Sequence, residues 1–469
     1  MLDVSSEDIT EGNLARALVF LATPLAAQGL VRVGEAVIDL FWLGRLSGDA
    51  VAGVGLADSF YALVIAAVIY APMVGTQVLV SQRVGSDDDE SARLTAFNGM
   101  VLGAVLAVVG GVLAFLFIDP VVGFLAGLES GGGGVNVEES ATTYLRVIFL
   151  GLSLAVVSDV LEMVYIGHGD SKTSLYMNVV PVLVNVTLDP LLIFGYGPFP
   201  RLEVQGAALA TVTSWGAGLL FGLVVLRTSR GTGLFSRAQA RLDRATMRDL
   251  LDTGAPIAGQ NLARQVARFA MVVVAFLAGG GAGVAAYYLG ARVAGVSFVP
   301  AGGLKNALQS VVGQNIGAER ADRADRATRV AFAIAVGLLT VVGVVQLLVP
   351  GAVVDLLAPT LDGTARGFAV DYLTILAYGY PAIGAAYMLE GGFNGTGRTK
   401  VPFVSTVLQF YAVRLPIGVG GALLLDFGVQ AVFWGVTVSN VVVAVGLGAY
   451  YLRSVNGGMM RRAAGTAAD

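Results

Sequence analysis

The chain contains no cysteine, one histidine and little charge of either sign. Only 13% of its 469 residues are charged. Without cysteine there are no disulfides and no thiolate metal site, and His168 alone cannot form a histidine metal cluster. No nucleophile with a histidine or cysteine partner exists, and no glycine-rich phosphate loop follows a strand. We therefore expect neither an enzyme nor a bound cofactor.

Lysine is also scarce. It stands only at positions 172, 305 and 400, so arginine supplies nearly all the positive charge. The net charge is −4, and an acidic run extends from Asp87 to Glu90. An acidic chain with so little lysine indicates a halophilic prokaryote, although a biased genome base composition produces the same pattern. No motif for binding nucleic acid is present.

Apolar residues dominate instead. They make up 56% of the chain, and the mean hydropathy is +0.76. The charge-free runs 94–118, 330–354 and 427–452 each exceed the roughly 20 residues that a helix needs to cross a bilayer. We therefore expect an all-α polytopic membrane protein with twelve transmembrane helices. The expected spans lie near residues 14–44, 50–82, 93–118, 139–165, 173–195, 205–227, 246–278, 283–316, 327–349, 367–393, 401–424 and 428–452.

The basic residues predict the orientation of these spans. Arginines fill the connections after the sixth and eighth spans, at Arg241, Arg244 and Arg248 and again at Arg320 and Arg323. Because cytoplasmic loops carry an excess of basic residues, both termini are expected inside the cell, with the chain in the plasma membrane. The first thirteen residues lack the basic region of a signal peptide, so the apolar run that follows is expected to remain as the first span.

The chain repeats itself. The segment that begins at Pro24 matches the one that begins at Pro256, at an offset of 232 that also pairs Arg32 with Arg264. A second offset, 228, pairs Glu162 with Glu390. We therefore predict an N-lobe at 1–228 with six helices, an arginine-rich cytoplasmic linker at 229–245, and a C-lobe at 246–469. A central cavity between the lobes is expected.

Two acids lie deep inside apolar spans. Asp39 and Asp189 are placed where an ionised carboxylate is expensive, so each is expected to take up a proton or a cation. Asn185 lies four residues before Asp189 on the same helix face. Such groups can couple ion flow to another movement, which indicates a transporter. Simpler roles stay open, because Asp39 can pair with Arg32, and Asp189 can bond backbone groups freed near Pro190.

Several segments resemble the multidrug and toxic compound extrusion (MATE) family. They are Pro24 with the stretch 37–46, the stretch 185–195, Gly313 to Gly317, and Gly395 to Lys400. Together they are most similar to its archaeal and DinF-like branch. The resemblance implies a MATE fold of two pseudo-twofold-related lobes in a monomer. It also implies an antiporter that exports amphipathic, often cationic drugs by alternating access, driven by H+ or Na+.

The resemblance assigns roles to residues of the first lobe. It implies that Asp39 and Asp189 carry the ion coupling, and that the Thr211 hydroxyl and the Ala207 carbonyl complete a site in the sixth helix. A sodium ion at Asp39, Asn185, Asp189 and Thr211 is one alternative, and a shared proton is the other. For Thr211, a helix-packing hydroxyl is equally compatible with the sequence.

The bend expected in the first span depends on Pro24, because proline removes a helical hydrogen bond. Relatives are thought to bend there when the first-lobe acid is protonated. Pro256 shares the position but has no matching acid, since Met271 corresponds to Asp39. Pro24 can therefore also fix a permanent kink.

A second group of residues is assigned to the substrate cavity: Glu35, Gln28, Tyr144, Asp159 and Glu162. An internal pair between Arg32 and Glu35 is the simpler interpretation of Glu35. Glu162 is mirrored by Glu390, and a feature kept in both halves favours a structural role. In the second lobe, Arg264 stands where other branches of the family place a working glutamate. Arg264, Arg292 and Arg414 must be paired within protein or water.

One rival function remains within transport. A lipid-linked oligosaccharide flippase of the same superfamily also has two lobes. Twelve spans without an additional carboxyl-terminal pair, and a cavity centred on carboxylates, disfavour anionic lipid pyrophosphates. The expected partners are therefore small organic cations and the lipid bilayer.

Overall fold

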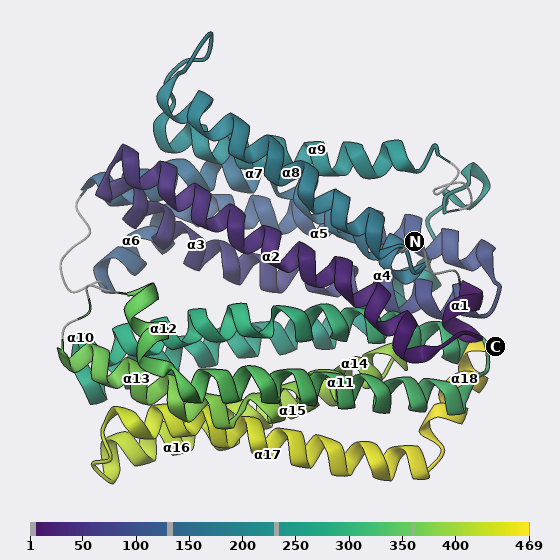
Figure 1. Ribbon diagram of the computed structural model, residues 1–469. Coiled ribbons are helices and arrows are strands. Elements are labelled where there is room, and N and C mark those ends of the chain that lie inside the picture. Colours follow the sequence, from purple (N-terminus) through teal and green to yellow (C-terminus); the bar gives the residue numbers. More distant parts are fainter. Residues whose placement is uncertain (1–5, 129–134, 229–233, 359–360, 362, 469) are drawn as a thin grey trace. The chain divides into compact units, whose positions relative to one another are not determined.

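The structure is a computed structural model that describes residues 6–128, 135–228, 234–358, 361 and 363–468. Helices make up the regular structure of these ranges, and no strand occurs in them (Figure 1). Ten of the described helices are long and apolar enough to cross a membrane. The expectation of an all-α polytopic membrane protein is thus confirmed, whereas the number twelve stays a prediction.

The described residues of the first half of the chain form nine α-helices and one short 3₁₀ turn. They are α1 (Ser6–Thr10), α2 (Leu14–Leu46), α3 (Gly48–Val68), α4 (Tyr70–Gly85), α5 (Asp89–Leu116), α6 (Ile118–Leu128), α7 (Val135–Gly167), α8 (Ser171–Phe194), α9 (Glu203–Val225) and η1 (Arg237–Gln239). The predicted linker 229–245 contains η1, and its residues 229–233 lie outside the described ranges.

The second half begins with a long helix and includes two π-helical segments. Its elements are α10 (Arg244–Gly317), α11 (Ala321–Leu348), α12 (Pro350–Leu357), α13 (Gly363–Tyr378), α14 (Tyr380–Gly395), α15 (Lys400–Val407), η2 (Leu408–Arg414), α16 (Leu415–Val419), η3 (Gly420–Leu424), α17 (Val429–Asn456) and α18 (Met459–Ala468).

Glycine and proline decide where the expected spans are interrupted. Gly280 has a positive φ of 57° inside α10, which separates the expected seventh and eighth spans. The expected second span divides into α3 and α4 just before Pro72, and the expected tenth divides into α13 and α14 just before Pro381. Proline fits the first turn of a helix, where no hydrogen bond is lost, so each proline starts a new helical segment.

The chain folds into two compact units. Unit 1 comprises Met1–Asp3 and Ala27–Ala258, and unit 2 comprises Val4–Ala26 and Gly259–Asp469. The boundaries at Ala26 and Ala258 are separated by 232 residues, which is the offset of the sequence repeat. The units therefore differ from the predicted lobes in two segments, since 4–26 joins unit 2 and 246–258 joins unit 1. The lobes as functional domains stay a prediction.

Unit 1 is organised around α7. This helix packs against α3, α4, α5, α8 and α9, and its inward face includes Leu145, Leu152 and Val156. The α8–α9 pair approaches closely at Gly206, because a Cβ there would lie 2.5 Å from the Leu192 carbonyl oxygen. Gly195 ends α8 with a left-handed φ of 74°. These glycines set the position of α9 beside the acidic end of α8.

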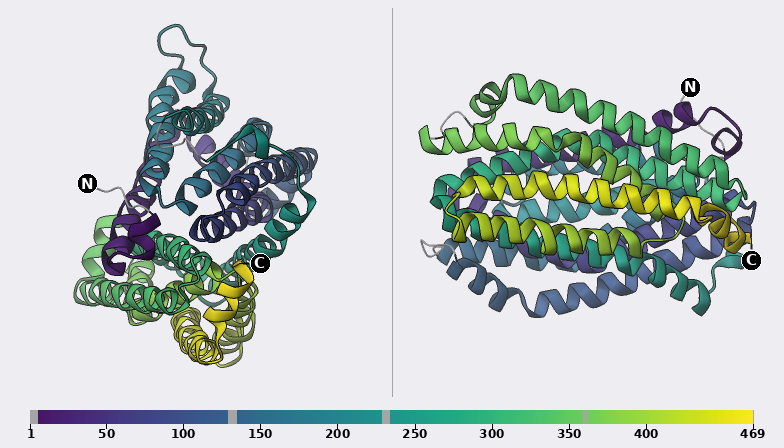
Figure 2. Two further views of the ribbon diagram at one scale, coloured as in Figure 1. Left: turned by 90° about the vertical axis from the view of Figure 1, so that its right-hand side faces the viewer. Right: turned by 90° about the horizontal axis from the view of Figure 1, so that it is seen from below.

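Unit 2 is organised around α17. This helix contacts α13, α14, α16 and η2, and it runs lengthwise beside the α15–η3 segment (Figure 2). Its core contains stacked aromatic rings, with Tyr372 and Phe433 at 4.5 Å between ring centroids. An aromatic core of this kind holds the helices of the second unit together.

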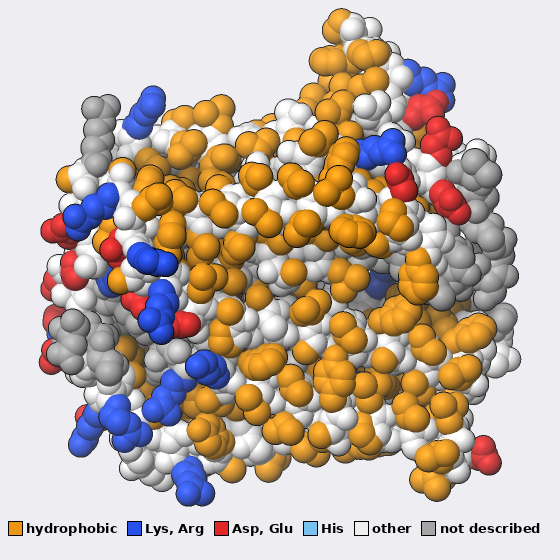
Figure 3. All heavy atoms as spheres, turned by 180° about the vertical axis from the view of Figure 1, so that it is seen from behind, with side chains coloured by type: hydrophobic (Ala, Val, Ile, Leu, Met, Phe, Trp, Pro, Cys, Tyr) orange, Lys and Arg blue, Asp and Glu red, His pale blue; other side chains and the backbone are white. Residues whose placement is uncertain are grey.

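The outer faces of the helices are apolar. Val105, Val108, Val112 and Leu116 are exposed along one side of α5, and hydrophobic side chains cover much of the visible surface (Figure 3). In water such a surface would drive aggregation, whereas in a membrane it contacts lipid.

The described end of the linker is tied to unit 1. The fully buried Asn98 of α5 donates to the Arg241 carbonyl oxygen at 3.0 Å and accepts from the Asp243 amide at 2.9 Å. Asp243 in turn caps α10, and hydrogen bonds from the side chain and backbone of Thr246 lower the pKa of its carboxyl group. The linker is therefore anchored to α5 between η1 and α10.

The Asn98→Ala variant is expected to unfold at a lower temperature than the wild type. The change removes the hydrogen bonds to the half-buried Asp243 amide and to the Arg241 carbonyl oxygen, each worth about 0.5–1.5 kcal/mol. Thermal unfolding of the purified protein in detergent measures this. Asn136→Ala removes an exposed hydrogen bond to Asp49 and serves as the control; equal shifts in both variants would contradict the anchoring role.

Candidate functional site

An apolar cluster joins the ends of α2, α8 and α9. Leu43, Ile193, Val204 and Ala207 are buried in it, and Trp42 packs against them. The Trp42 and Phe194 rings meet edge to face at 6.0 Å. Because side chains four residues apart share a helix face, the groups one turn before Leu43 and Ile193 are brought together.

Those groups are the two acids predicted from the sequence. Asp39 lies one turn before Leu43, and Asp189 one turn before Ile193. The two carboxyl groups are close enough to share a hydrogen bond, and Glu35 acts electrostatically on both. Asp189 is only 2% exposed, and Asn185 only 1%. The structure thus brings together Asp39, Asn185 and Asp189 from helices far apart in the sequence.

Several polar atoms of this site have no hydrogen-bond partner in the part of the chain that the structure describes. They are Oδ1 of Asp39 and both the oxygen and the nitrogen of the Asn185 amide. A buried polar group without a partner costs about 1–3 kcal/mol. Two adjacent carboxylates add like-charge repulsion. A proton or a small cation between the carboxyl groups removes both penalties.

The simpler roles for these acids are not observed. Within the described residues, Asp39 forms no ion pair with Arg32, and Asp189 accepts no hydrogen bond from the backbone near Pro190. No group of three or more His, Cys, Asp or Glu in the described ranges is arranged to hold a metal ion. A cation at this site would therefore also need oxygens from Asn185 and from α9.

The α9 residues lie beside the acids but satisfy one another. The Thr211 hydroxyl donates to the Ala207 carbonyl oxygen at 3.0 Å, the local bond that a helix commonly forms. Tyr144 of α7 lies within hydrogen-bonding range of the Thr211 hydroxyl and close enough to Asp39 to feel its charge. The roles predicted for Ala207, Thr211 and Tyr144 stay predictions.

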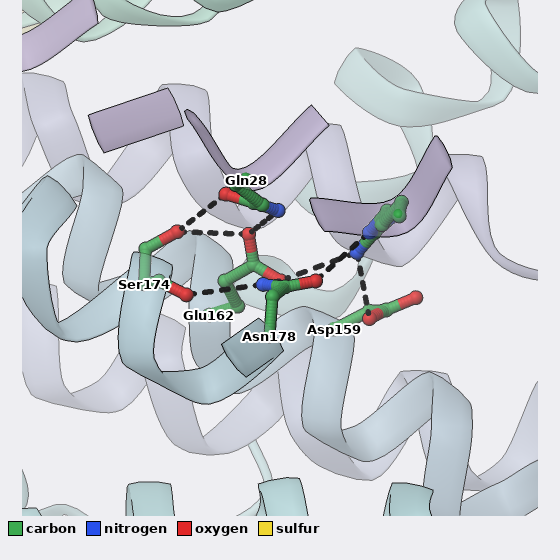
Figure 4. A network of polar contacts seen from close by, with 6 residues as sticks. Gln28, Asp159, Glu162, Ser174 and Asn178 are labelled. Carbon is green, nitrogen blue, oxygen red and sulfur yellow. Dashed lines mark hydrogen bonds and ion pairs between the residues drawn. The ribbon is translucent and has the colours of Figure 1, made fainter. Parts of the chain in front are cut away.

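A second polar cluster in unit 1 is centred on Glu162 (Figure 4). Glu162 Oε1 accepts from Gln28 at 2.7 Å and from Ser174 at 2.9 Å, and Oε2 accepts from Asn178 at 3.0 Å. The carboxylate is thus held by three donors and is only 2% exposed. A carboxylate satisfied in this way favours a structural role over direct contact with substrate.

Arg32 forms its hydrogen bond and ion pairs with this cluster and not with Glu35. Its guanidinium donates to the Asn178 side chain at 2.8 Å and pairs with Glu162 at 3.6 Å and Asp159 at 3.8 Å. The interpretation of an Arg32–Glu35 pair is therefore wrong. Glu35 is left free of an ion pair in the described part of the chain because Arg32 is turned toward α7 and α8.

The sequence analysis missed Ser174 and Asn178. They lie four residues apart on α8, at the same spacing as Asn185 and Asp189. That spacing was the available signal for a polar stripe along one face of α8.

Unit 2 contains a related cluster with a different charge balance. Lys305 pairs with Glu390 at 2.5 Å, and Gln260 donates to Thr406 at 2.9 Å. Glu390 matches Glu162, and Gln260 matches Gln28 in the repeat. A lysine thus takes the place that the amide and hydroxyl donors of Ser174 and Asn178 have around Glu162.

Pro24 is buried inside α2, which continues through it from Leu14 to Leu46. The proline lies two residues before the boundary at which α2 passes from unit 2 to unit 1. The missing hydrogen bond weakens the helix at this point. Bending of α2 at Pro24 stays a prediction.

Comparisons with known proteins follow the same repeat. A family model described as MatE matches residues 24–191 and 256–419. A probable multidrug resistance protein NorM from Thermotoga maritima is 25% identical, over 88% of this chain and 86% of its own length. An FAD transporter from Shewanella oneidensis is 24% identical, over 94% of each chain.

Solved structures share the fold. A crystal structure of MATE in complex with MaL6 matches with a TM-score of 0.88 at 24% identity, covering 97% of this chain and 99% of that chain. The chain therefore has the fold that the sequence resemblance predicted.

Replacing Glu162 tests its structural role. Glu162→Gln is expected to lower the unfolding temperature clearly, because the new amide turns a donor toward groups that need an acceptor. Asp159→Asn, which removes only a long and half-exposed ion pair, is expected to have a small effect. Thermal unfolding in detergent measures both variants, and the reverse order would contradict the assignment.

Replacing Asp39 tests the repulsion between the two acids. In sodium-free buffer, the wild type is expected to unfold at a lower temperature at pH 8 than at pH 5.5, because protonation relieves the repulsion. Asp39→Asn removes one charge and is expected to reduce this difference. Asp49→Asn, on the exposed first turn of α3, is the control; an equal response of both variants would argue against close contact.

Proposed function

We propose that this chain, which belongs to the MatE family, is a cation-coupled antiporter that exports amphipathic organic compounds across the membrane. The family assignment confirms the resemblance found in the sequence, while the archaeal and DinF-like branch stays a prediction. The observation that carries the proposal is the adjacency of Asp39 and Asp189, with buried polar atoms of Asp39 and Asn185 left without partners.

In this mechanism a proton or a sodium ion binds between the two carboxyl groups. Binding neutralises the pair and fills the unsatisfied positions, so it stabilises one arrangement of α2 against α8 and α9. Because α2 continues through Pro24, a change at Asp39 is transmitted along the helix toward unit 2. Ion and substrate then favour opposite arrangements, and each lowers the affinity for the other by the same factor.

The names of the relatives support export of organic compounds. One is a multidrug resistance protein and another is an FAD transporter, so the cargo of similar proteins ranges from drugs to a charged dinucleotide. Transport relatives also agree with a protein that is not an enzyme. A carboxylate-centred site in unit 1 supports a drug exporter over the flippase alternative. The inside position of both termini and the halophilic origin stay predictions.

Transport by the purified protein in liposomes tests the proposal. We expect ethidium to move against an imposed pH gradient or sodium gradient, and the gradient that drives it identifies the coupling ion. Asp39→Asn is expected to reduce driven transport to the level of empty liposomes, because the variant cannot gain or lose a charge at this position.

Asp49→Asn is the matched control, since it removes one exposed carboxylate and is expected to leave transport unchanged. Full driven transport by Asp39→Asn would refute the coupling site. No transport of ethidium by the wild type under either gradient would refute the antiporter and favour the flippase, for which binding of a pyrophosphate lipid is then measured.

A further inference from the structure

Three arginines meet inside unit 2. Arg264 and Arg268 are one turn apart on α10, and Arg414 ends the π-helical segment η2. The segment η2 touches α10 next to Arg264, because the Tyr411 hydroxyl donates to the Ala263 carbonyl oxygen at 3.0 Å. The three positive charges repel one another. We call these three residues the arginine cluster. Like charges at this depth repel one another strongly, because the surroundings screen them weakly.

Neutral groups are the direct partners of the cluster. Arg414 is 7% exposed, and it donates to the Ser439 hydroxyl at 2.9 Å and to the Asn440 side-chain oxygen at 2.8 Å. Arg268 donates to Gln265 at 3.2 Å. Among the residues that the structure describes, no carboxylate forms an ion pair with any of the three arginines.

The nearest acid does not neutralise the cluster. Arg264 acts electrostatically on Glu390, but Lys305 already pairs with that carboxylate at 2.5 Å. One negative charge thus stands against Lys305 and three arginines. Arg414 is buried, and none of the three guanidinium groups pairs with an anion in the described residues, so added negative charge beside them is favourable.

The internal repeat allows the residues around Arg264 in unit 2 to be compared with those around Arg32 in unit 1. Arg264 matches Arg32, which pairs with Asp159 in unit 1. The offset of 228 places Tyr387 at the position of Asp159, and the offset of 232 places Arg268 at the position of Ala36. Around the matching arginine, unit 2 thus has a tyrosine where unit 1 has an acid, and an arginine where unit 1 has an alanine.

The cluster faces away from lipid. The exposed apolar side chains Leu262, Val266, Phe269 and Val273 form one face of α10. At 100° per residue, Arg264 and Arg268 lie on the opposite side of the helix. Arg268 is nevertheless exposed, so this second face is open to a polar ligand.

Aromatic rings surround the same region. The Arg414 guanidinium lies 4.1 Å from the centre of the Phe410 ring, and the rings of Tyr287 and Tyr372 stack at 5.7 Å. All three rings are buried, so they hold the Arg414 guanidinium in place within unit 2. The π-helical turn that carries Arg414 is a feature often found at functional sites.

We propose that the arginine cluster of unit 2 binds the carboxylate or phosphate group of an amphipathic substrate. This inference rests on the proposed export function and extends it from cations to zwitterionic and anionic compounds. Arg264, Arg268 and Arg414 neutralise the anionic group. Unit 1, with its acids at Asp39 and Asp189, takes the coupling cation.

Two pairs of fluorescent probes test whether an anionic group strengthens binding, because the members of each pair share a ring system and differ in one anionic group. Rhodamine B carries a free carboxylate that its ethyl ester lacks, and flavin mononucleotide carries a phosphate that riboflavin lacks. Binding of each probe to the purified full chain in detergent is measured by fluorescence anisotropy at constant pH and ionic strength. The wild type is expected to bind the anionic member of at least one pair more tightly, and the responding pair distinguishes carboxylate from phosphate.

Variants of the cluster test which residues bind the anion. Arg268→Gln and Arg414→Gln are expected to weaken binding of the anionic probe by about tenfold or more, which equals about 1.4 kcal/mol for the loss of a hydrogen bond to a charged group. Binding of the uncharged or esterified partner is expected to stay unchanged. Arg414→Lys keeps the charge without the planar fork and is expected to be intermediate.

Arg146→Gln is the matched control, because it removes one arginine from an exposed ion pair with Asp119 in unit 1. Equal affinity for both members of each pair would overturn the inference, and so would equal losses in Arg146→Gln and Arg268→Gln, or no binding of either anionic probe by the wild type. Arg268 is exposed, so its variant is expected to fold, which a thermal unfolding curve verifies.

The measurement is made at equilibrium without a gradient, so it is independent of ion coupling. If the Asp39→Asn variant prefers the anionic probes and also transports normally, the proposal of ion coupling at Asp39 is refuted and the proposal of anion binding is supported. If Asp39→Asn abolishes transport while both members of each probe pair bind equally to the wild type, only the proposal of anion binding is refuted.

Discussion

The cost of placing charge inside an apolar helical bundle governs how both units are built. Each charged side chain at this depth needs a partner, and the structure provides partners unequally. Glu162 accepts three hydrogen bonds and Glu390 pairs with Lys305, so these acids are satisfied within the protein. Asp39 and Asp189 face each other instead. Unsatisfied groups of this kind are available to bind ions, because binding lowers their free energy.

The internal repeat gives the two units one scaffold with different charges. Gln28 and Arg32 in unit 1 correspond to Gln260 and Arg264 in unit 2, and both sets lie near a glutamate. Around this shared frame, unit 1 carries additional acids, whereas unit 2 carries additional arginines. The two units therefore share the positions of their helices, while different residues at a few inward positions make the charge negative in unit 1 and positive in unit 2. A transporter can in this way bind a cation in one unit and an anionic group in the other.

The long helix α2 carries Asp39 and crosses the boundary between the units at Ala26. It carries Pro24 in the segment that belongs to unit 2 and Gln28, Arg32, Glu35 and Asp39 in the segment that belongs to unit 1. Gln28 and Arg32 are held by the Glu162 cluster, and Leu43 is held by the apolar cluster at the helix end. Asp39 thus lies between two fixed points, so a change in its charge acts on a well-defined segment of helix.

The sequence alone determined the all-α membrane class, the repeat, the family, the acid Asp39 in the first span, and Asp189 with Asn185 on one face of α8. Hydropathy, helical periodicity and repeat offsets are local or linear properties, so they can be read from the chain. The tertiary structure decided that Arg32 pairs with Asp159 and Glu162 and not with Glu35, that Ser174 and Asn178 hold Glu162, and that units divide at Ala26 and Ala258. It also decided that Arg414 meets Arg264 and Arg268. These outcomes depend on how helices distant in sequence rotate and pack against one another, and no spacing within a single helix encodes that.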